Sequence, residues 1–310
     1  MCTAESLRHP LVLIVGHGLS PRRLSVPPPD NPIHVIPIEL LALLAALGAG
    51  MFGAVAGVGG GIILVPLLSV GLGVPLHNAI AVSLLGVIAV STTAAANYLE
   101  AGLVSRRIGL TLLVSTALGG IIGGFVAGFV NARLLAALFG IVLIAVALRM
   151  LFGREPVEPA TVDDLGPLEF DATYVEPRTG EEVAYRVRNF GIGSVVSVFA
   201  GMLSGLLGIG GGVINVPTMS SLMGVPIRVA TTTSTYMLGA TAAASAVLYF
   251  SRGEVEAALA GAVVVGSVVG ARVGAWLHHL LPQRALTLIF VGVAAFFAFQ
   301  MLLRALGTAA

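Results

Sequence analysis

The chain has 310 residues, of which 57% are hydrophobic and only 10% are charged, and its mean hydropathy is +1.01. Because a water-soluble domain carries about a quarter charged residues, the composition excludes a soluble enzyme, a disordered chain and a disulfide scaffold. It predicts a polytopic membrane protein. The formal net charge of +1 argues against a nucleic-acid partner. The single cysteine, Cys2, excludes an internal disulfide and a cysteine metal site.

Composition divides the chain into five segments. Residues 1–37 are a loose, proline-rich tail without a signal-peptide pattern, and residues 305–310 are a short C-terminal tail. Residues 38–152 and 190–304 are apolar, and each region is long enough for four membrane spans. Residues 153–189 form an acidic insert between them.

Glycine, proline and charged residues delimit the predicted spans. In the first region we expect spans at about 38–55, 78–99, 108–129 and 134–151, and a half-length span at 62–70. In the second region we expect them at about 190–207, 229–250, 255–277 and 285–303, with a half-length span at 213–222. The predicted fold class is an all-α polytopic membrane protein with two homologous four-span repeats and discontinuous, glycine-broken helices.

The acidic insert is predicted to lie outside the membrane. It holds nine of the fifteen acidic residues: Glu155, Glu158, Asp163, Asp164, Glu169, Asp171, Glu176, Glu181 and Glu182. Apolar and polar residues alternate over Phe170–Val175 and Val183–Val187, and the turn-forming segment Pro177–Gly180 lies between them. This pattern predicts a β-hairpin.

The two apolar regions are related by an internal duplication. A shift of 151 residues, without a gap, superimposes Gly57-Val58-Gly59-Gly60-Gly61 on Gly208-Ile209-Gly210-Gly211-Gly212. The same shift pairs Pro66 with Pro217, Ser83 with Ser234 and Tyr98 with Tyr249. Duplicated halves are typical of secondary transporters, which build one site where the repeats meet.

The placement of arginine predicts the topology, because basic residues gather in short cytoplasmic loops. If each glycine break joins its neighbours into one span, Arg106, Arg107, Arg252 and Arg304 lie inside and Arg228 lies outside. This favours eight crossings, with both termini and the acidic insert in the cytoplasm. Four crossings per half would relate the repeats by an axis along the membrane normal, whereas a re-entrant break would give inverted repeats. The sequence leaves that choice open.

The repeated Gly-x-Gly-Gly-Gly motif is the strongest candidate for a site. Glycine costs about 1 kcal/mol relative to alanine inside a helix, and unwound backbone at membrane depth occurs where it is buried or lines a wet cavity. A short helix follows each break, and its N-terminus offers free N–H groups and a partial positive charge. Two such ends that converge near the midplane would hold an anion without a buried lysine or arginine.

Hydroxyl and amide side chains follow on the next helix of each repeat, at helical spacing. Neutral donors suit a weakly bound oxyanion that must leave again. Asn215, where the first repeat has Leu64, is the most site-like difference between the repeats. The predicted substrate-binding residues are Gly57, Gly59, Gly60, Gly61, Pro66, Ser83, Thr93, Asn97, Gly208, Gly210, Gly211, Gly212, Asn215, Pro217, Ser234 and Thr235.

Several alternative interpretations compete with this one. The glycines can serve helix packing alone, and the hydroxyls can bond to their own helices. Arg272, in the seventh span, can attract an anion toward a vestibule or snorkel to the surface. His278 and His279 have no third ligand nearby, so we expect no metal site. We also expect no cofactor and no catalytic residue.

The chain resembles the TauE/SafE sulfite exporter family of membrane permeases in three features. These are the doubled glycine motif with proline five residues on, the following Gly73-Val74-Pro75 and Gly224-Val225-Pro226, and the acidic insert. The resemblance covers about Ile38 to Leu303. It implies a permease for sulfite, sulfoacetate or a related sulfur-containing or organic anion. The family's glycine and proline positions correspond here to Gly57, Gly59, Gly60, Gly61 and Pro66, and to Gly208, Gly210, Gly211, Gly212 and Pro217.

The leading hypothesis is a multi-pass carrier of the bacterial inner membrane that exports a small anion by alternating access. An inside-negative potential favours export by roughly 2.3 kcal/mol per charge per 100 mV. The partners expected are the anion and the lipid bilayer, and the sequence leaves the oligomeric state open. The competing hypotheses are uptake of a related anion, an intramembrane enzyme with Ser204 as nucleophile, and a non-transporting scaffold.

Overall fold

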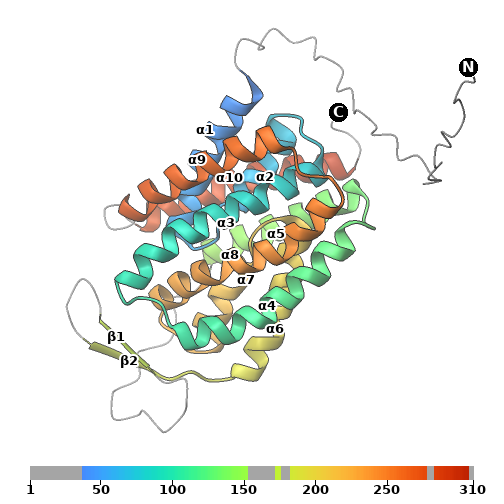
Figure 1. Ribbon diagram of the computed structural model, residues 1–310. Coiled ribbons are helices and arrows are strands. Elements are labelled where there is room, and N and C mark those ends of the chain that lie inside the picture. Colours follow the sequence, from blue (N-terminus) through green and yellow to red (C-terminus); the bar gives the residue numbers. More distant parts are fainter. Residues whose placement is uncertain (1–36, 153–171, 176–181, 278–282, 307–310) are drawn as a thin grey trace, which may run out of the picture. The chain divides into compact units, whose positions relative to one another are not determined.

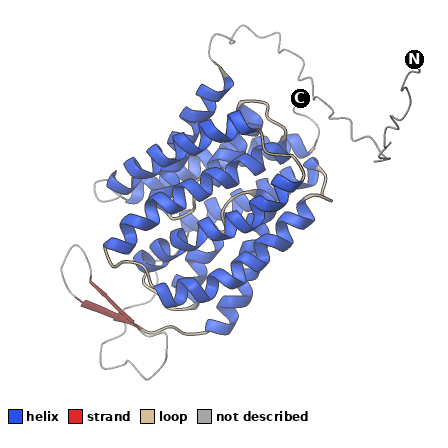
Figure 2. Cartoon of the chain, viewed as in Figure 1, coloured by secondary structure: helices blue, strands red, loops and turns tan. Residues whose placement is uncertain are grey.

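The computed structural model describes residues 37–152, 172–175, 182–277 and 283–306, and within these ranges it is almost entirely helical (Figures 1 and 2). Its first half comprises α1 (Ile38–Ala56), α2 (Gly61–Pro66), the π-helical turn η1 (Leu67–Gly71), α3 (Leu76–Glu100), α4 (Arg106–Ala127) and α5 (Ala132–Phe152). Strands β1 (Ala172–Val175) and β2 (Glu182–Tyr185) follow. Its second half comprises α6 (Phe190–Leu207), α7 (Gly212–Pro217), the π-helical turn η3 (Thr218–Leu222), α8 (Ile227–Ser251), α9 (Ala257–Leu277) and α10 (Gln283–Ala305).

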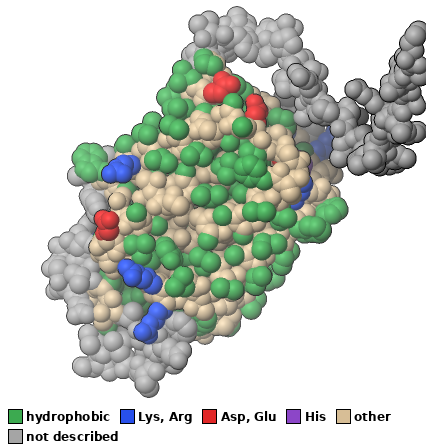
Figure 3. Space-filling view, viewed as in Figure 1, with side chains coloured by type: hydrophobic (Ala, Val, Ile, Leu, Met, Phe, Trp, Pro, Cys, Tyr) green, Lys and Arg blue, Asp and Glu red, His purple; other side chains and the backbone are tan. Residues whose placement is uncertain are grey.

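Six of these helices are long and apolar enough to cross a membrane: α1, α3, α4, α5, α6 and α9. Much of their outer surface carries exposed large apolar side chains, such as Phe125, Val195 and Phe199. Figure 3 shows one face covered mainly by apolar side chains, with charged groups near its edges. The chain is therefore an all-α polytopic membrane protein, as the composition predicts.

The element boundaries repeat with the same shift as the sequence. Moved by 151 residues, α2, η1 and α3 coincide with α7, η3 and α8 at both ends. The packing repeats as well, because α1 packs on α9 while its counterpart α6 packs on α4. The first helix of each half therefore rests on the other half, and the two halves are interlocked.

The chain reverses direction at each glycine break. Gly60 lies against Ala49 and Gly50 of α1, so the segment after the break runs back beside the helix that precedes it. Leu64 and Leu68 of this returning segment belong to the same apolar cluster as Ala42 and Ala46 of α1. Each half therefore begins with a re-entrant hairpin, and three long helices follow it.

The long central helices α3 and α8 run antiparallel. The Ser91 hydroxyl donates a hydrogen bond to the Thr235 carbonyl (2.5 Å), whereas Thr232, nearer the start of α8, donates to Leu103, which follows α3 (2.6 Å). Residues later in α3 thus contact residues earlier in α8. Equivalent helices that lie antiparallel require a two-fold axis perpendicular to them, so the repeats are inverted.

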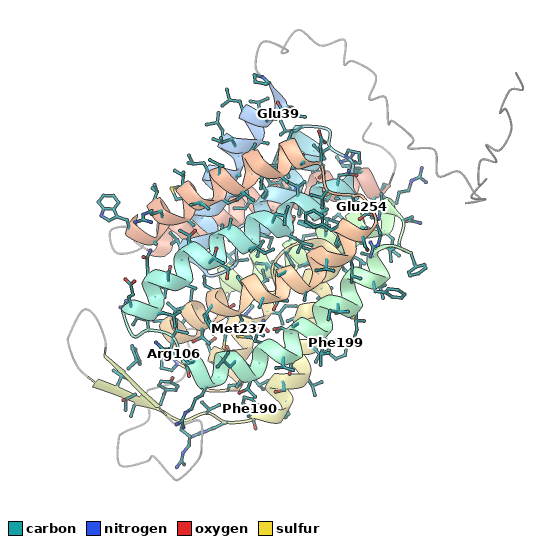
Figure 4. All side chains as sticks on the ribbon, in the orientation of Figure 1. Glu39, Arg106, Phe190, Phe199, Met237 and Glu254 are labelled. Carbon is teal, nitrogen blue, oxygen red and sulfur yellow. The ribbon has the colours of Figure 1, made fainter. Side chains whose placement is uncertain are left out.

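This arrangement differs from the predicted topology of eight crossings with the insert and both termini on one side. The start of α1 and the end of α10 lie at one end of the bundle, which we call the terminal end. The β-strands and the starts of α4, α6 and α8 lie at the other, the hairpin end. Figure 4 shows Glu39 and Glu254 toward the terminal end, and Arg106 and Phe190 toward the hairpin end. The prediction fails because a re-entrant segment adds a reversal but no crossing.

The inverted arrangement also reassigns the arginines. Among the described side chains, Arg106, Arg107, Arg149, Arg186, Arg188, Arg228 and Arg272 lie at the hairpin end, and Arg133, Arg252 and Arg304 at the terminal end. Arg228 therefore lies at the same end as Arg106 and Arg107, whereas the predicted topology put it on the opposite side. Arg252 and Arg304, predicted to share a side with Arg106 and Arg107, lie at the other end. Since basic residues accumulate in cytoplasmic loops, this distribution favours the hairpin end as the cytoplasmic one.

Strands β1 and β2 form within the segments where the sequence alternates. They pair antiparallel, with Thr173 opposite Ala184 and Tyr174 opposite Val183. Tyr185 and Val187 join an apolar cluster with Ile108 of α4 and Val229 of α8. Burial raises the pKa of the Tyr185 phenol, and a hydrogen bond with Ser105 opposes that shift. Most of the acidic insert, the N-terminal tail and the pair His278 and His279 lie outside the described residues.

Single-cysteine variants test the inverted topology. In a Cys2→Ser background, we expect Thr173→Cys at the hairpin end and Ser251→Cys at the terminal end, both exposed, to react with a membrane-impermeant maleimide from opposite faces of the membrane. Leu306→Cys, at the end of the chain's last helix, should label like Ser251→Cys. Labelling of Thr173→Cys and Ser251→Cys from the same face would contradict the inverted fold.

Candidate functional site

The two glycine breaks meet each other at the centre of the bundle. A Cβ on Gly61 would overlap the carbonyl oxygen of Gly208, and a Cβ on Gly212 would overlap the carbonyl oxygen of Gly57. These are equivalent contacts of the two repeats. The structure therefore brings together the two breaks that the sequence predicts to converge, and with them the N-termini of α2 and α7.

Backbone geometry explains the composition of the motif. Gly57, Gly59 and Gly60 have φ values of 70°, 79° and 77°, which only glycine adopts without strain. Their counterparts Gly208, Gly210 and Gly211 have φ values of 70°, 82° and 74°. The last glycine of each motif has an ordinary φ, and its lack of a side chain instead admits the carbonyl oxygen of the opposite break. Each glycine thus has a structural requirement of its own.

Two equivalent apolar side chains pack against the middle glycine of both breaks, while the flanking glycines of the breaks touch directly. A Cβ on Gly59 would lie 3.0 Å from Val87 Cγ1 and 3.1 Å from Leu238 Cδ1. A Cβ on Gly210 would lie 3.0 Å from the same Val87 atom. Val87 and Leu238 are fully buried and are related by the repeat shift. They form an apolar plug at the middle glycines, Gly59 and Gly210, and no simple sequence pattern distinguishes them from ordinary core residues.

Pro66 and Pro217 lie one turn and a half beyond the breaks. Each is the last residue of its short α-helix, and a π-helical turn follows directly. Because proline has no N–H to donate, the regular hydrogen-bond ladder cannot continue through it. The chain stays helical with a wider turn, so the returning segment is longer than the short α-helix alone.

The polar groups around the two breaks differ between the repeats. The Ser83 hydroxyl, beside the second break, donates hydrogen bonds to the carbonyl oxygens of Ile80 (2.8 Å) and Gly208 (3.1 Å). Its counterpart Ser234 lies 3.1 Å from the Cβ position of Gly212, yet its hydroxyl is buried and has no hydrogen-bond partner. Both serines therefore lie beside the second break, but only the Ser83 hydroxyl has hydrogen-bond partners.

Three further buried polar atoms without partners lie on α6 and α7 of the second repeat. They are the hydroxyls of Ser197 and Ser204 on α6 and Oδ1 of Asn215 on α7. Ser204 approaches the break, because its Cβ lies 3.4 Å from the Cβ position of Gly211. We call Ser197, Ser204, Asn215 and Ser234 the polar cluster; each is at most 1% exposed.

The first repeat has no equivalent of this cluster. The residues at the corresponding positions are Ala46, Gly53, Leu64 and Ser83, of which only the last can form side-chain hydrogen bonds. Leu64 instead packs in an apolar cluster with Ala46. Buried polar groups are normally paired, and an unpaired one costs about 1–3 kcal/mol. Four unpaired atoms on α6, α7 and α8 of the second repeat therefore make this region the candidate for a polar site.

The remaining predicted site residues lie apart from the breaks or bond elsewhere. Thr93 is partly exposed, and Asn97 is exposed near the hairpin end of α3. Thr235 donates its hydroxyl to the Thr231 carbonyl (2.9 Å). These three side chains are not joined to the breaks by any contact that the structure describes. Thr93 and Asn97 lie nearer the end of α3, because the breaks contact its middle, at Val87.

Sequence analysis missed two members of the polar cluster as binding residues. Ser197 was not distinguished at all, and Ser204 was considered only as a nucleophile. Comparison of the repeats offers a signal, because serine replaces Ala46 and Gly53 at these two positions. Among the described residues, no group of three or more His, Cys, Asp or Glu side chains is arranged to hold a metal ion.

A buried network fixes the helices around the cluster. The Thr241 and Thr116 hydroxyls are 2.9 Å apart, and the Ser245 hydroxyl donates to the Gly120 carbonyl (3.0 Å). The Tyr249 hydroxyl donates to Gly205 of α6 (2.8 Å). Its counterpart Tyr98 donates to Ala54 (3.0 Å), so both re-entrant hairpins are held in the same way.

The fold combines inverted repeats, paired re-entrant hairpins, broken helices at the centre and a polar cluster beside one break. This architecture is typical of membrane transport proteins. The chain belongs to the sulfite exporter TauE/SafE family, whose match covers residues 42–301. This confirms the resemblance that the glycine motifs and their spacing suggest.

Curated relatives are membrane transporters by name. The chain is 27% identical to "Probable membrane transporter protein YunE" of Bacillus subtilis over 258 residues, which is 80% of this chain and 92% of that protein. It is 32% identical to "Probable membrane transporter protein MamO" of Magnetospirillum gryphiswaldense over 117 residues, which is 35% of this chain and only 18% of that protein. No solved structure matches the chain.

The contact between the two breaks predicts the effect of one added methyl group. Gly212→Ala should lower the thermal stability of the detergent-solubilised protein, because overpacking against the Gly57 carbonyl costs about 1–3 kcal/mol. Gly261→Ala, on α9 with nothing within 4 Å of its Cβ position, is the matched control and should keep or slightly raise the melting temperature, because alanine is favoured over glycine inside a helix. Equal stability of the two variants would show that the breaks do not touch.

Proposed function

We propose that this permease exports a small anion, such as sulfite or an organosulfonate, across the bacterial inner membrane by alternating access. The polar cluster beside the second glycine break carries the proposal, since its four buried polar atoms lack partners. Serine hydroxyls donate hydrogen bonds, and the side-chain amide of Asn215 carries an N–H donor beside its unpartnered acceptor Oδ1. Together with the start of the α7–η3 segment they suit an oxyanion.

The site uses neutral groups for a physical reason. An arginine or lysine at membrane depth is expensive to bury and binds an anion tightly. Backbone N–H groups, hydroxyls and an amide stabilise the anion less strongly, so that it can be released to the other side. None of the residues of the polar cluster is ionisable, which fits a carrier that binds and releases its substrate in each cycle.

Alternating access requires that the centre opens to each side in turn. Val87 and Leu238 close the space between the breaks in this structure, and they contact both glycine motifs. We infer that a relative movement of the two re-entrant hairpins displaces this plug toward one end and then the other. The inverted repeat supports this mechanism, because its two halves present the same elements to opposite faces.

Export follows from electrostatics without a coupling ion. An inside-negative membrane potential drives an anion outward by roughly 2.3 kcal/mol per charge per 100 mV. With the arginine-rich hairpin end in the cytoplasm, anions would be attracted to the side from which export begins. Uptake would require a cation or proton to travel with the anion, and the polar cluster contains no carboxylate for that role.

An enzymatic reading finds less support. Within the described ranges the only histidine is His77, whose Nε2 lies 3.2 Å from the Val130 carbonyl at the terminal end. Ser204 lies beside the second glycine break, on a different part of the bundle. A serine nucleophile needs a base within hydrogen-bond reach, so we assign Ser204 to binding.

Matched serine variants test the transport site. In proteoliposomes with an inside-negative potential, wild-type protein should release sulfite or a short alkanesulfonate. Ser234→Ala should lower kcat/KM about tenfold or more, because a hydrogen bond to a charged group contributes about 1.5–3 kcal/mol. Ser69→Ala, which removes another buried, unpartnered hydroxyl away from the breaks, should transport like the wild type.

Two results would contradict the proposal. No anion flux from well-folded wild-type protein, tested over a small panel of sulfur oxyanions, sulfonates and carboxylates, would rule out the anion carrier. Equal flux for Ser234→Ala and the wild type would show that the polar cluster is not the binding site.

A further inference from the structure

A second polar site lies at the hairpin end, apart from the polar cluster. A cavity of about 620 Å³ opens there between the end of α3, the start of α8 and the end of α9. Its lining includes two arginines, Arg228 and Arg272, together with the side chains of Asn97, Tyr98, Thr232 and Trp276. None of its lining residues is acidic. We call this cavity the vestibule.

The two arginines give the vestibule a positive potential. Arg228 lies in the first turn of α8, where the helix dipole adds partial positive charge. Arg272 is exposed and, among the described residues, has no hydrogen-bond or ion-pair partner. An unpaired guanidinium presents several N–H donors in a fixed plane, a geometry that matches carboxylate, sulfonate and phosphate oxygens.

The other repeat does not provide the same groups. At the positions equivalent to Arg272, Asn97, Arg228 and Thr232, the terminal end carries Ile121, Leu248, His77 and Ala81. The arginine that does lie there, Arg252, is engaged by the Gly124 carbonyl, by Glu254 at 3.6 Å and by the ring of Tyr249. The duplication thus supplies the architecture at both ends, and the substitutions create an anion-attracting cavity at only one.

The walls of the vestibule also indicate the kind of anion. Leu103, Val273, Ala275 and Trp276 contribute apolar surface beside the two guanidinium groups. A bare inorganic oxyanion needs far less space than 620 Å³ and gains nothing from apolar walls. An anionic head group attached to a short apolar body uses both features.

We propose that the vestibule is a loading site that binds an organic anion with an apolar body, through Arg272 and with the positive charge of Arg228 nearby, before it moves to the central site. This inference rests on the proposed function and adds a substrate class and a starting side to it. The chain's single tryptophan, Trp276, is 65% exposed and lines the vestibule, so its fluorescence can report occupancy directly.

The test is a binding titration that needs no transport. Purified wild-type protein in nanodiscs of neutral phosphatidylcholine is titrated with hexanesulfonate, and Trp276 emission is recorded. We expect a saturable change, and an apparent Kd raised about tenfold or more by Arg272→Gln, since a charge-assisted hydrogen bond is lost. Arg272→Lys should restore part of the affinity, because it retains the charge but not the planar geometry.

Control titrations identify the ligand and separate the two proposals. Arg133→Gln, at an exposed position of the terminal end, should bind like the wild type. Sulfite should bind at least tenfold more weakly than hexanesulfonate. Binding of hexanesulfonate that is the same in Arg272→Gln and the wild type overturns the loading site, whatever the flux assay shows.

A lipid head group could present the same chemistry, so a second set of nanodiscs contains phosphatidylglycerol. If this lipid alone changes Trp276 emission in an Arg272-dependent way and hexanesulfonate does not, the vestibule is a lipid site and the proposal is wrong. Arg272-dependent binding of hexanesulfonate without flux in proteoliposomes supports the site but contradicts the carrier.

Discussion

The contact between the two glycine breaks is the constraint on which the rest of the structure depends. Two stretches of irregular backbone pass each other at the centre of an apolar bundle, so close that a methyl group on Gly61 or Gly212 would overlap the opposite chain. Irregular backbone survives at membrane depth only when protein surrounds it. The interlocked halves provide that surrounding, because α1 packs on α9 and α6 packs on α4.

Features shared by the two repeats and features found in only one repeat have different roles in this protein. The symmetric elements are structural: the glycine conformations, the proline-initiated π turns and the hydrogen bonds from Tyr98 and Tyr249 recur in both repeats. The asymmetric positions are chemical. Polar residues replace Ala46, Gly53 and Leu64 beside the second break, and arginine replaces Ile121 at the hairpin end. A duplicated scaffold thus supplies two similar hairpins, and a few substitutions supply the polar residues on which the proposed site and direction rest.

The proposed anion carrier contains little buried charge for the same physical reason. Where substrate must bind and leave within the membrane, neutral donors limit the affinity; where it must only be attracted, at the bundle's end, arginines raise its local concentration. Arg252, with Glu254 and Gly124 as partners, shows that an arginine alone does not make a binding site. Its guanidinium group is engaged within the protein by a carbonyl oxygen, a carboxylate and an aromatic ring.

The sequence by itself determined the class of protein, the helices, the duplication and the positions of the two breaks, because hydropathy and glycine spacing are local properties of the chain. The contact between the two breaks came only from the tertiary structure. It did not determine the direction of the chain after Gly60, since a half-length helix is equally apolar whether it continues or turns back. Only tertiary packing against Ala49 decided this, and with it the inversion of the repeats and the end to which Arg228 belongs. Tertiary structure likewise decided that Ser83 is satisfied and Ser234 is not, because hydrogen-bond partners come from residues distant in the chain.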